Sequence, residues 1–81
     1  MSDKTQKFLA KLPAKELEKA LSIIAQVRAG KLEGLGTKHL KGHPGYFRIR
    51  AGRMRIVFRR SGTDYEIIQV SYRDDQTYRD F

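Results

Sequence analysis

The spacing of apolar residues changes period near the middle of this chain of 81 residues, and this change constrains the fold more than any other feature. In residues 1–30 apolar side chains recur at helical intervals, which is typical of amphipathic helices. In residues 46–72 they alternate with polar ones, which is typical of strands with one buried face. Residues 31–45 hold four glycines and Pro44, which predicts a loop. The sequence therefore predicts an α+β fold, with helices first and a sheet second.

Two helices are expected before the loop. Pro13 separates them, because proline lacks the N–H that a continuing helix needs but is well tolerated in a first turn. The first helix places Phe8, Leu9 and Leu12 on one face. The second ends at Gly30, since glycine terminates helices readily. We expect its apolar stripe to face the core and to consist of Leu17, Ala20, Leu21, Ile24 and Val27.

Three antiparallel strands are expected in the second half, at residues 46–51, 54–59 and 66–72. Gly52 and the residue after it can form a two-residue hairpin turn, with glycine at the position that needs a positive φ. This turn pairs Ile49 with Ile56 on one face of the sheet. On the opposite face it places Arg50 directly across from Arg55. The prediction is two helices packed on one face of a three-stranded antiparallel sheet.

The third strand has two possible registers. If Phe58 pairs with Ile68, then Ile56 pairs with Val70 and the apolar residues stay together. A shift of one residue would instead put Gln69 in the core, so we prefer the first register. The face turned away from the helices is then polar and basic, and it carries Arg48, Arg50, Arg55, Arg59, Gln69, Ser71 and Arg73.

Length and composition limit the class of protein. A chain of 81 residues suits a single domain spanning residues 1–81. It has no cysteine, which excludes disulfides and fits a reducing cytosol. No apolar run approaches the roughly 20 residues of a membrane span, and the N-terminus has no signal-peptide core, so we expect a cytoplasmic protein with no membrane partner. Two histidines and scattered carboxylates lack the spacing of a metal site, so neither a metal nor another cofactor is expected.

The net charge of +8 is concentrated in the middle third of the chain. Between Gly34 and Thr63 there is no acidic residue. The same segment holds eight cations, Lys38, Lys41, Arg48, Arg50, Arg53, Arg55, Arg59 and Arg60. A basic patch of this kind attracts a polyanion, most commonly a phosphate backbone, although a solvated surface is the alternative interpretation.

The predicted pairing of Arg50 with Arg55 favours the binding interpretation. Like charges directly opposite each other destabilise a sheet, and proteins usually tolerate such conflicts where a function uses them. An anionic ligand would relieve this one.

Five short motifs occur in a recognisable order along the chain. They are K-x-L-x-K-L-P, K-x-L-K-G, Y-x-R-I-R, R-I-V-F and a strand-ending arginine before a tyrosine, at residues 7–13, 38–42, 46–50, 55–58 and 73–78. Together they resemble the RelE/ParE family of bacterial toxins, over roughly residues 7–79. The resemblance implies helices packed on one face of a twisted antiparallel sheet. Family members usually begin with a strand, whereas this chain starts almost directly at the helices, so we expect the first strand to be missing.

In the RelE branch of this family the basic face receives messenger RNA on the ribosome, and a cognate antitoxin neutralises the toxin. The RNA's own 2′-hydroxyl attacks the adjacent phosphate without a metal, while the protein positions the strand and stabilises the added negative charge. By motif position, the resemblance assigns catalytic roles to Arg55, Arg73 and Tyr78. We expect RNA binding by Lys38, Lys41, Arg48, Arg50, Arg53 and Arg59.

Proton transfer needs a different residue type from phosphate binding. The planar guanidinium group of arginine binds phosphate through two parallel hydrogen bonds. It does not deprotonate in proteins, however, and is therefore a poor general base. The remaining candidates are Tyr78, His43 and Tyr46. The two loop histidines are more often surface residues without a role, and Tyr46 and Tyr72 more often pack in the sheet than stack on bases.

Three functions remain open from the sequence. The first is a ribosome-dependent endoribonuclease toxin. The second is a ParE-like inhibitor of DNA gyrase, which needs no catalytic residues. The third is a relative that binds RNA without cutting it. The dense arginine face and the tyrosine near the end favour the first, because a gyrase inhibitor has no need of them.

Overall fold

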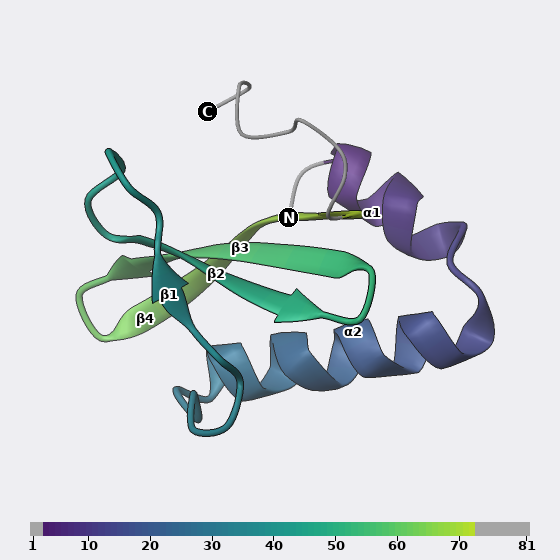
Figure 1. Cartoon of the computed structure of the whole chain (residues 1–81), viewed down its shortest axis with the longest axis horizontal. Helices are drawn as coiled ribbons and strands as arrows, with labels where there is room; N and C mark the ends of the chain where they lie inside the picture. The colour runs from purple at the N-terminus through teal and green to yellow at the C-terminus, as the bar shows by residue number, and fades with distance from the viewer. Residues whose placement is uncertain (1–2, 73–81) are drawn as a thin grey trace.

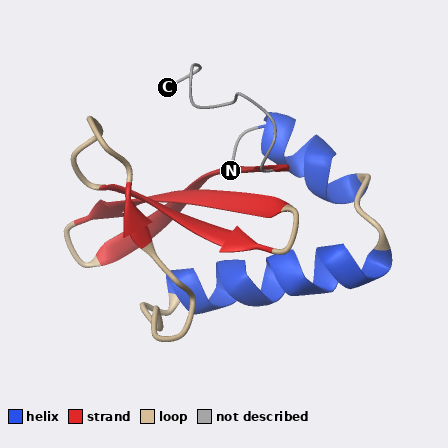
Figure 2. Ribbon diagram, viewed as in Figure 1, coloured by secondary structure: helices blue, strands red, loops and turns tan. Residues whose placement is uncertain are grey.

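The computed structural model describes residues 3–72, which form two helices and a four-stranded sheet. The elements are α1 (Asp3–Ala10), α2 (Ala14–Arg28), β1 (Lys38–His39), β2 (Tyr46–Ala51), β3 (Met54–Ser61) and β4 (Asp64–Tyr72). The strands lie in the order β1-β2-β3-β4, and every neighbouring pair is antiparallel. α2 runs along one side of the sheet, and α1 lies beside the end of β4 (Figures 1 and 2). The α+β class with helices on one face is confirmed.

The sheet has four strands instead of the three predicted. The additional strand, β1, lies in the segment expected to be a loop, where Lys38 pairs with Arg48 and His39 with Phe47. The backbone N–H of Leu40 extends this contact by donating to the Tyr46 carbonyl at 2.9 Å. Two residues give too short an alternation for a sequence pattern to show, which is why the strand was missed. α1 begins at Asp3, the first residue that the structure describes.

The helix boundaries lie where proline and glycine predicted them. Pro13 stands at the start of α2, and its carbonyl accepts the N–H of Leu17 at 2.9 Å. Gly30 has a φ of +73°, which a residue with a Cβ adopts only with strain. Around it the N–H of Lys31 donates to the Gln26 carbonyl at 2.8 Å, as in a Schellman motif.

α2 presents a slightly different stripe to the sheet from the one predicted. Leu21 is 49% exposed, whereas Ile23 is only 7% exposed and belongs to the core. Ala20, Ile23, Ile24 and Val27 follow the spacing i, i+3, i+4, i+7, so Leu21 lies beyond the edge of the buried stripe. The expectation that Leu21 faces the core was wrong.

One apolar core joins the helices to the sheet. Leu9 of α1 and Leu12, which follows this helix, belong to the core. Ile56 and Phe58 of β3 are fully buried in it. Phe8 meets the ring of Tyr72 edge-on at 4.9 Å, so α1 is fastened to the end of β4. These contacts fix where each strand lies, and therefore where its other side chains point.

The β2–β3 hairpin has the predicted register. Ala51 pairs with Met54, Ile49 with Ile56, and Arg50 with Arg55. The turn glycine, at position 52, has a φ of +58°, as a two-residue hairpin turn requires.

The β3–β4 register is as predicted at one end only. Ile56 pairs with Val70, but a β-bulge puts Phe58 opposite Ile67 and not opposite Ile68. A regular ladder would have turned Glu66 toward the core, whereas the extra residue in β4 puts Ile67 there and leaves Glu66 exposed. The predicted pairing of Phe58 with Ile68 was therefore wrong, because it made no allowance for a bulge.

None of the helices in the described part of the chain is long and apolar enough to cross a membrane.

Candidate nucleic-acid interface

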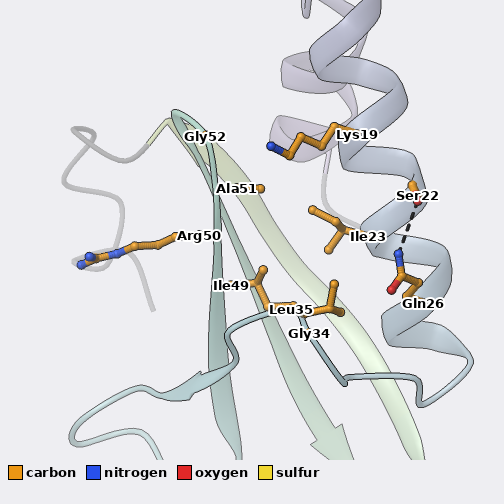
Figure 3. A pocket seen from close by; sticks show the side chains of 10 residues that line it. All are labelled: Lys19, Ser22, Ile23, Gln26, Gly34, Leu35, Ile49, Arg50, Ala51 and Gly52. Carbon is orange, nitrogen blue, oxygen red and sulfur yellow. Dashed lines mark hydrogen bonds between the residues drawn. The ribbon is translucent and has the colours of Figure 1, made fainter.

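The face of the sheet turned away from the helices carries a cluster of cations. Side chains alternate along a strand, so Ile49 and Ala51 point to α2 while the residue between them points to the opposite side. Figure 3 shows the side chain of Arg50 leaving β2 in the direction away from α2. We call this surface the basic face and define it by Lys38, Arg48, Arg50, Arg55 and Arg59.

Like charges stand directly opposite each other at two places on the basic face. Arg48 is paired with Lys38 across β1 and β2, and Arg50 with Arg55 across β2 and β3. Side chains at directly paired positions are separated by roughly 5 Å at Cβ, and equal charges at that distance repel. The conflict predicted from the sequence is therefore present, with a second pair beside it. Two such pairs on adjacent strands favour an anionic ligand, because a bound anion would reduce both repulsions.

The charge is partly neutralised at the other end of the strands. Nη2 of Arg59 lies 2.8 Å from Oε2 of Glu66, and both side chains are exposed. Sequence reasoning did not identify this pair. A two-residue turn at Gly62 and the residue after it would have predicted it, since that turn aligns positions 59 and 66. The strongest positive charge thus lies toward Arg48 and Arg50.

Arg55 is the most buried residue of the basic face. It is on the predicted face, but it is only 9% exposed, and the neighbouring Val57 and Ser71 are buried as well. A buried guanidinium has fewer rotamers open to it and is less screened by water than an exposed one. By this argument Arg55 is held more rigidly than the exposed Arg50 and would act more strongly on a bound anion.

Two residues predicted to bind RNA lie elsewhere. Arg53 is in the β2–β3 turn and reaches the helix side, where its Nη2 lies 2.6 Å from Oε1 of Glu16 and its guanidinium lies 5.0 Å from the centre of the Tyr72 ring. It is thus not part of the basic face. Lys41 is exposed in the turn that follows β1.

Of the three candidates for proton transfer, the structure describes His43 and Tyr46. The rings of His43 and Tyr46 are 6.0 Å apart, and Tyr46 is paired with Arg59 at the end of β2. Tyr72 packs against Phe8 on the helix side, as the packing interpretation predicted. The predicted catalytic residues Arg73 and Tyr78 lie outside the described residues.

Metal ligands do not gather in the described part of the chain. No group of three or more His, Asp or Glu side chains within residues 3–72 is placed to hold a metal ion.

Comparison with known proteins finds a solved structure with a similar fold. The chain matches a chain in the crystal structure of the RelB-RelE antitoxin-toxin complex from Methanococcus jannaschii, with a TM-score of 0.78 and 24% sequence identity. The match covers 99% of this chain and 95% of that one. No family model and no curated protein matches the sequence. The two chains therefore share their fold over nearly the whole length, and at this identity the likeness shows the fold alone.

Proposed function

We propose that this protein is the toxin of a toxin–antitoxin pair and cleaves messenger RNA on the ribosome without a metal. The observation that carries this proposal is the pairing of Arg50 with Arg55 beside that of Arg48 with Lys38. A phosphate backbone along β2 would relieve both conflicts at once. The fold shared with a chain of an antitoxin–toxin complex supports the same function. The pair acts in the cytoplasm, and the whole chain, residues 1–81, is the toxin domain.

The reaction is a transfer of the phosphate within the RNA. The 2′-oxygen bonds to the adjacent phosphorus, and the bond from that phosphorus to the 5′-oxygen of the next nucleotide breaks. The products are a 2′,3′-cyclic phosphate and a 5′-hydroxyl. One proton leaves the 2′-hydroxyl and one reaches the 5′-oxygen, so no metal or other co-reactant is consumed.

Each part of the basic face has a role in this reaction. Arg48 and Arg50 bind the phosphates on either side of the cleaved bond, since a guanidinium contacts phosphate through two parallel hydrogen bonds. Arg55, which is only 9% exposed, stabilises the charge that builds on the phosphate in the transition state. Arg73 assists it, and Tyr78 transfers a proton, with Tyr46 and His43 as the alternatives for that step.

The alternative functions differ in their targets. A gyrase inhibitor would not use the cations of β2, and an RNA-binding relative would use them without cutting. The ribonuclease and the RNA-binding relative would both use the basic face, so only an assay of cleavage separates these two functions.

Primer extension on a reporter mRNA, with and without translating ribosomes, tests the proposal. We expect cuts that appear only with ribosomes and vanish in Arg73→Ala, while Lys4→Ala, which removes a cation from α1, leaves them unchanged. An uncut message under both conditions contradicts the proposal. A supercoiling assay would then test gyrase inhibition, and an RNA-binding assay would test the non-catalytic relative.

A further inference from the structure

Gln69 lies on the same side of the sheet as the basic face. It pairs with Val57 across β3 and β4, and Val57 pairs with Arg48 across β2 and β3. Side chains at directly paired positions point to the same side of a sheet, so Gln69 projects away from the helices. Val70, the next residue along β4, points to the core instead and is 2% exposed. The surface of cations therefore continues onto β4 with a neutral amide.

The amide of Gln69 lies close to the buried arginine of the basic face. Arg55 is paired with Ser71, two residues after Gln69 on β4. Gln69 is thus the diagonal neighbour of Arg55, at a separation of roughly 7–8 Å. Arg48 lies in the same row as Gln69, two strand spacings or about 9–10 Å away. This span leaves room for the sugar and base of one nucleotide between a phosphate bound at Arg48 and the amide.

The β-bulge of β4 comes immediately before Gln69. Phe58 pairs with Ile67 and Val57 with Gln69, so Ile68 is the extra residue. Bulges increase the local twist of a strand, change the direction of nearby side chains and are frequent next to active sites. The irregular part of β4 therefore adjoins the amide, as is typical of a strand that lines a binding site.

Gln69 adds a hydrogen-bond acceptor to a surface of donors. The lysine and arginine side chains that define the basic face only donate, which suits the oxygens of a phosphate. The carboxylate of Glu66 can accept, but it already receives a hydrogen bond from Nη2 of Arg59 at 2.8 Å. The half-buried amide of Gln69 makes no hydrogen bond in the part of the chain that the structure describes. Its oxygen can therefore accept from the amino group of a base, which none of these cations can do.

We propose that Gln69 recognises the base beside the cleaved phosphate and selects adenine. This inference rests on the proposed function, since it takes RNA as the ligand of the basic face. The amide oxygen accepts a hydrogen bond from the N6 amino group of adenine, and the amide N–H donates to N7. Guanine has two acceptors, O6 and N7, on the same edge and therefore suits arginine better than glutamine. The arginines bind phosphates and give no sequence preference, whereas Gln69 provides one.

Binding of short single-stranded RNA tests this assignment. The two probes are labelled heptanucleotides that contain uridine throughout, except for one central adenosine or guanosine. Anisotropy titrations at about 50 mM salt give both affinities. We expect the adenosine probe to bind at least about fivefold more tightly, because the guanosine probe cannot form the bidentate contact with the amide.

Variants at position 69 test whether the amide is the source of this preference. In Gln69→Leu the two affinities should differ by less than about twofold, because the side chain has no polar group. Gln69→Arg has donors only and should reverse the preference in favour of guanosine. Gln6→Arg, which adds the same charge on α1, should keep the preference for adenosine. The ratio of the two affinities is the quantity to compare, since a purely structural effect would change both affinities together.

Three results would overturn the role of Gln69. The first is equal affinity of the unchanged protein for the two probes. The second is an adenosine preference that survives in Gln69→Leu, which would place the recognition at another residue. The third is no binding of either probe up to about 1 mM. Circular dichroism checks that each variant folds, and Gln69→Met, which has a side chain of similar length, replaces Gln69→Leu if that variant does not.

Primer extension with translating ribosomes separates this result from the proposed function. If the message is cut but the adenosine preference is absent, cleavage stands and the role of Gln69 fails. If the preference is present and depends on Gln69 but no message is cut, base recognition stands and the ribonuclease proposal fails. If both hold, cuts should occur mainly beside adenosines, and this bias should be lost in Gln69→Leu.

Discussion

On the helix-covered face of the sheet, Ile49, Ile56 and Phe58 are almost completely buried, whereas the alternate positions on the other face hold Arg48, Arg50 and Arg55. The two faces use the same strands and the same hydrogen bonds. Their difference shows that apolar packing on one side holds like charges together on the other. Core residues and cations alternate along the same backbone, so the packing that fixes the core residues also fixes the strand positions from which the cations extend.

The strongest test of this comparison is to remove the buried cation of the basic face. Arg55→Ala should lower the rate of ribosome-dependent cleavage by about 100-fold or more, because a preorganised group that stabilises transition-state charge contributes on that scale. The protein should remain folded, since Arg55 lies outside the apolar core. Cleavage rates on a reporter mRNA and a far-UV spectrum check both parts. Unchanged cleavage, or loss of the fold, would show that the two faces do not divide their roles in this way.

The matching test on the other face removes part of the core. Ile56→Ala should lower the free energy of unfolding by about 2–5 kcal/mol, because a fully buried side chain leaves a cavity. The control is Leu21→Ala, which removes a leucine that is largely exposed and should change stability by less than about 0.5 kcal/mol. Urea denaturation of both variants gives the difference. Equal losses would contradict the observed helix orientation.

A smaller effect is expected from a single phosphate contact. Arg48→Gln should reduce the slope of log affinity against log salt concentration for single-stranded RNA by about 0.7, because one fewer counterion is released. Anisotropy titrations between about 50 and 200 mM salt measure the slope. Lys4→Gln, on α1, is the matched control and should leave it unchanged. An equal change in both variants would mean that RNA does not distinguish the basic face from the rest of the surface.

The smallest effect is expected where the basic face is already neutralised. Glu66→Gln breaks the exposed ion pair with Arg59 and should change stability by less than about 1 kcal/mol. It should also tighten RNA binding slightly, since it leaves one more cation unpaired. Weaker RNA binding in this variant would show that Glu66 orients Arg59 for its ligand and does not compete with it.

The sequence predicted those parts of the fold that depend on local residue types. Pro13 and Gly30 bound α2 as expected, and the glycine at position 52 set the β2–β3 register, including the pairing of Arg50 with Arg55. These features depend on the positive φ that glycine adopts and on the N–H that proline lacks, and both are properties of single residue types.

The features that the sequence did not predict depend on contacts between distant residues. β1 exists only because the loop folds back on Arg48, and the bulge opposite Phe58 exists because Ile67 fits the core better than Glu66. The same holds for the candidate site. Alternation placed Arg55 on the correct face, but its burial and the turning of Arg53 toward Glu16 depend on neighbours that a periodic pattern does not show.

The bulge has a consequence for how the length of this chain can change. In a regular strand, deleting one residue exchanges the two faces on one side of the cut, which would bury charges and expose the core. β4 already carries one surplus residue, so deleting Ile68 would leave Ile67 and Glu66 on the faces that they occupy now. β3 has no surplus residue, and a deletion beside Val57 would exchange the faces of everything beyond it. Relatives of this chain that lack one residue within β3 or β4 should therefore carry the gap in β4 and keep β3 intact.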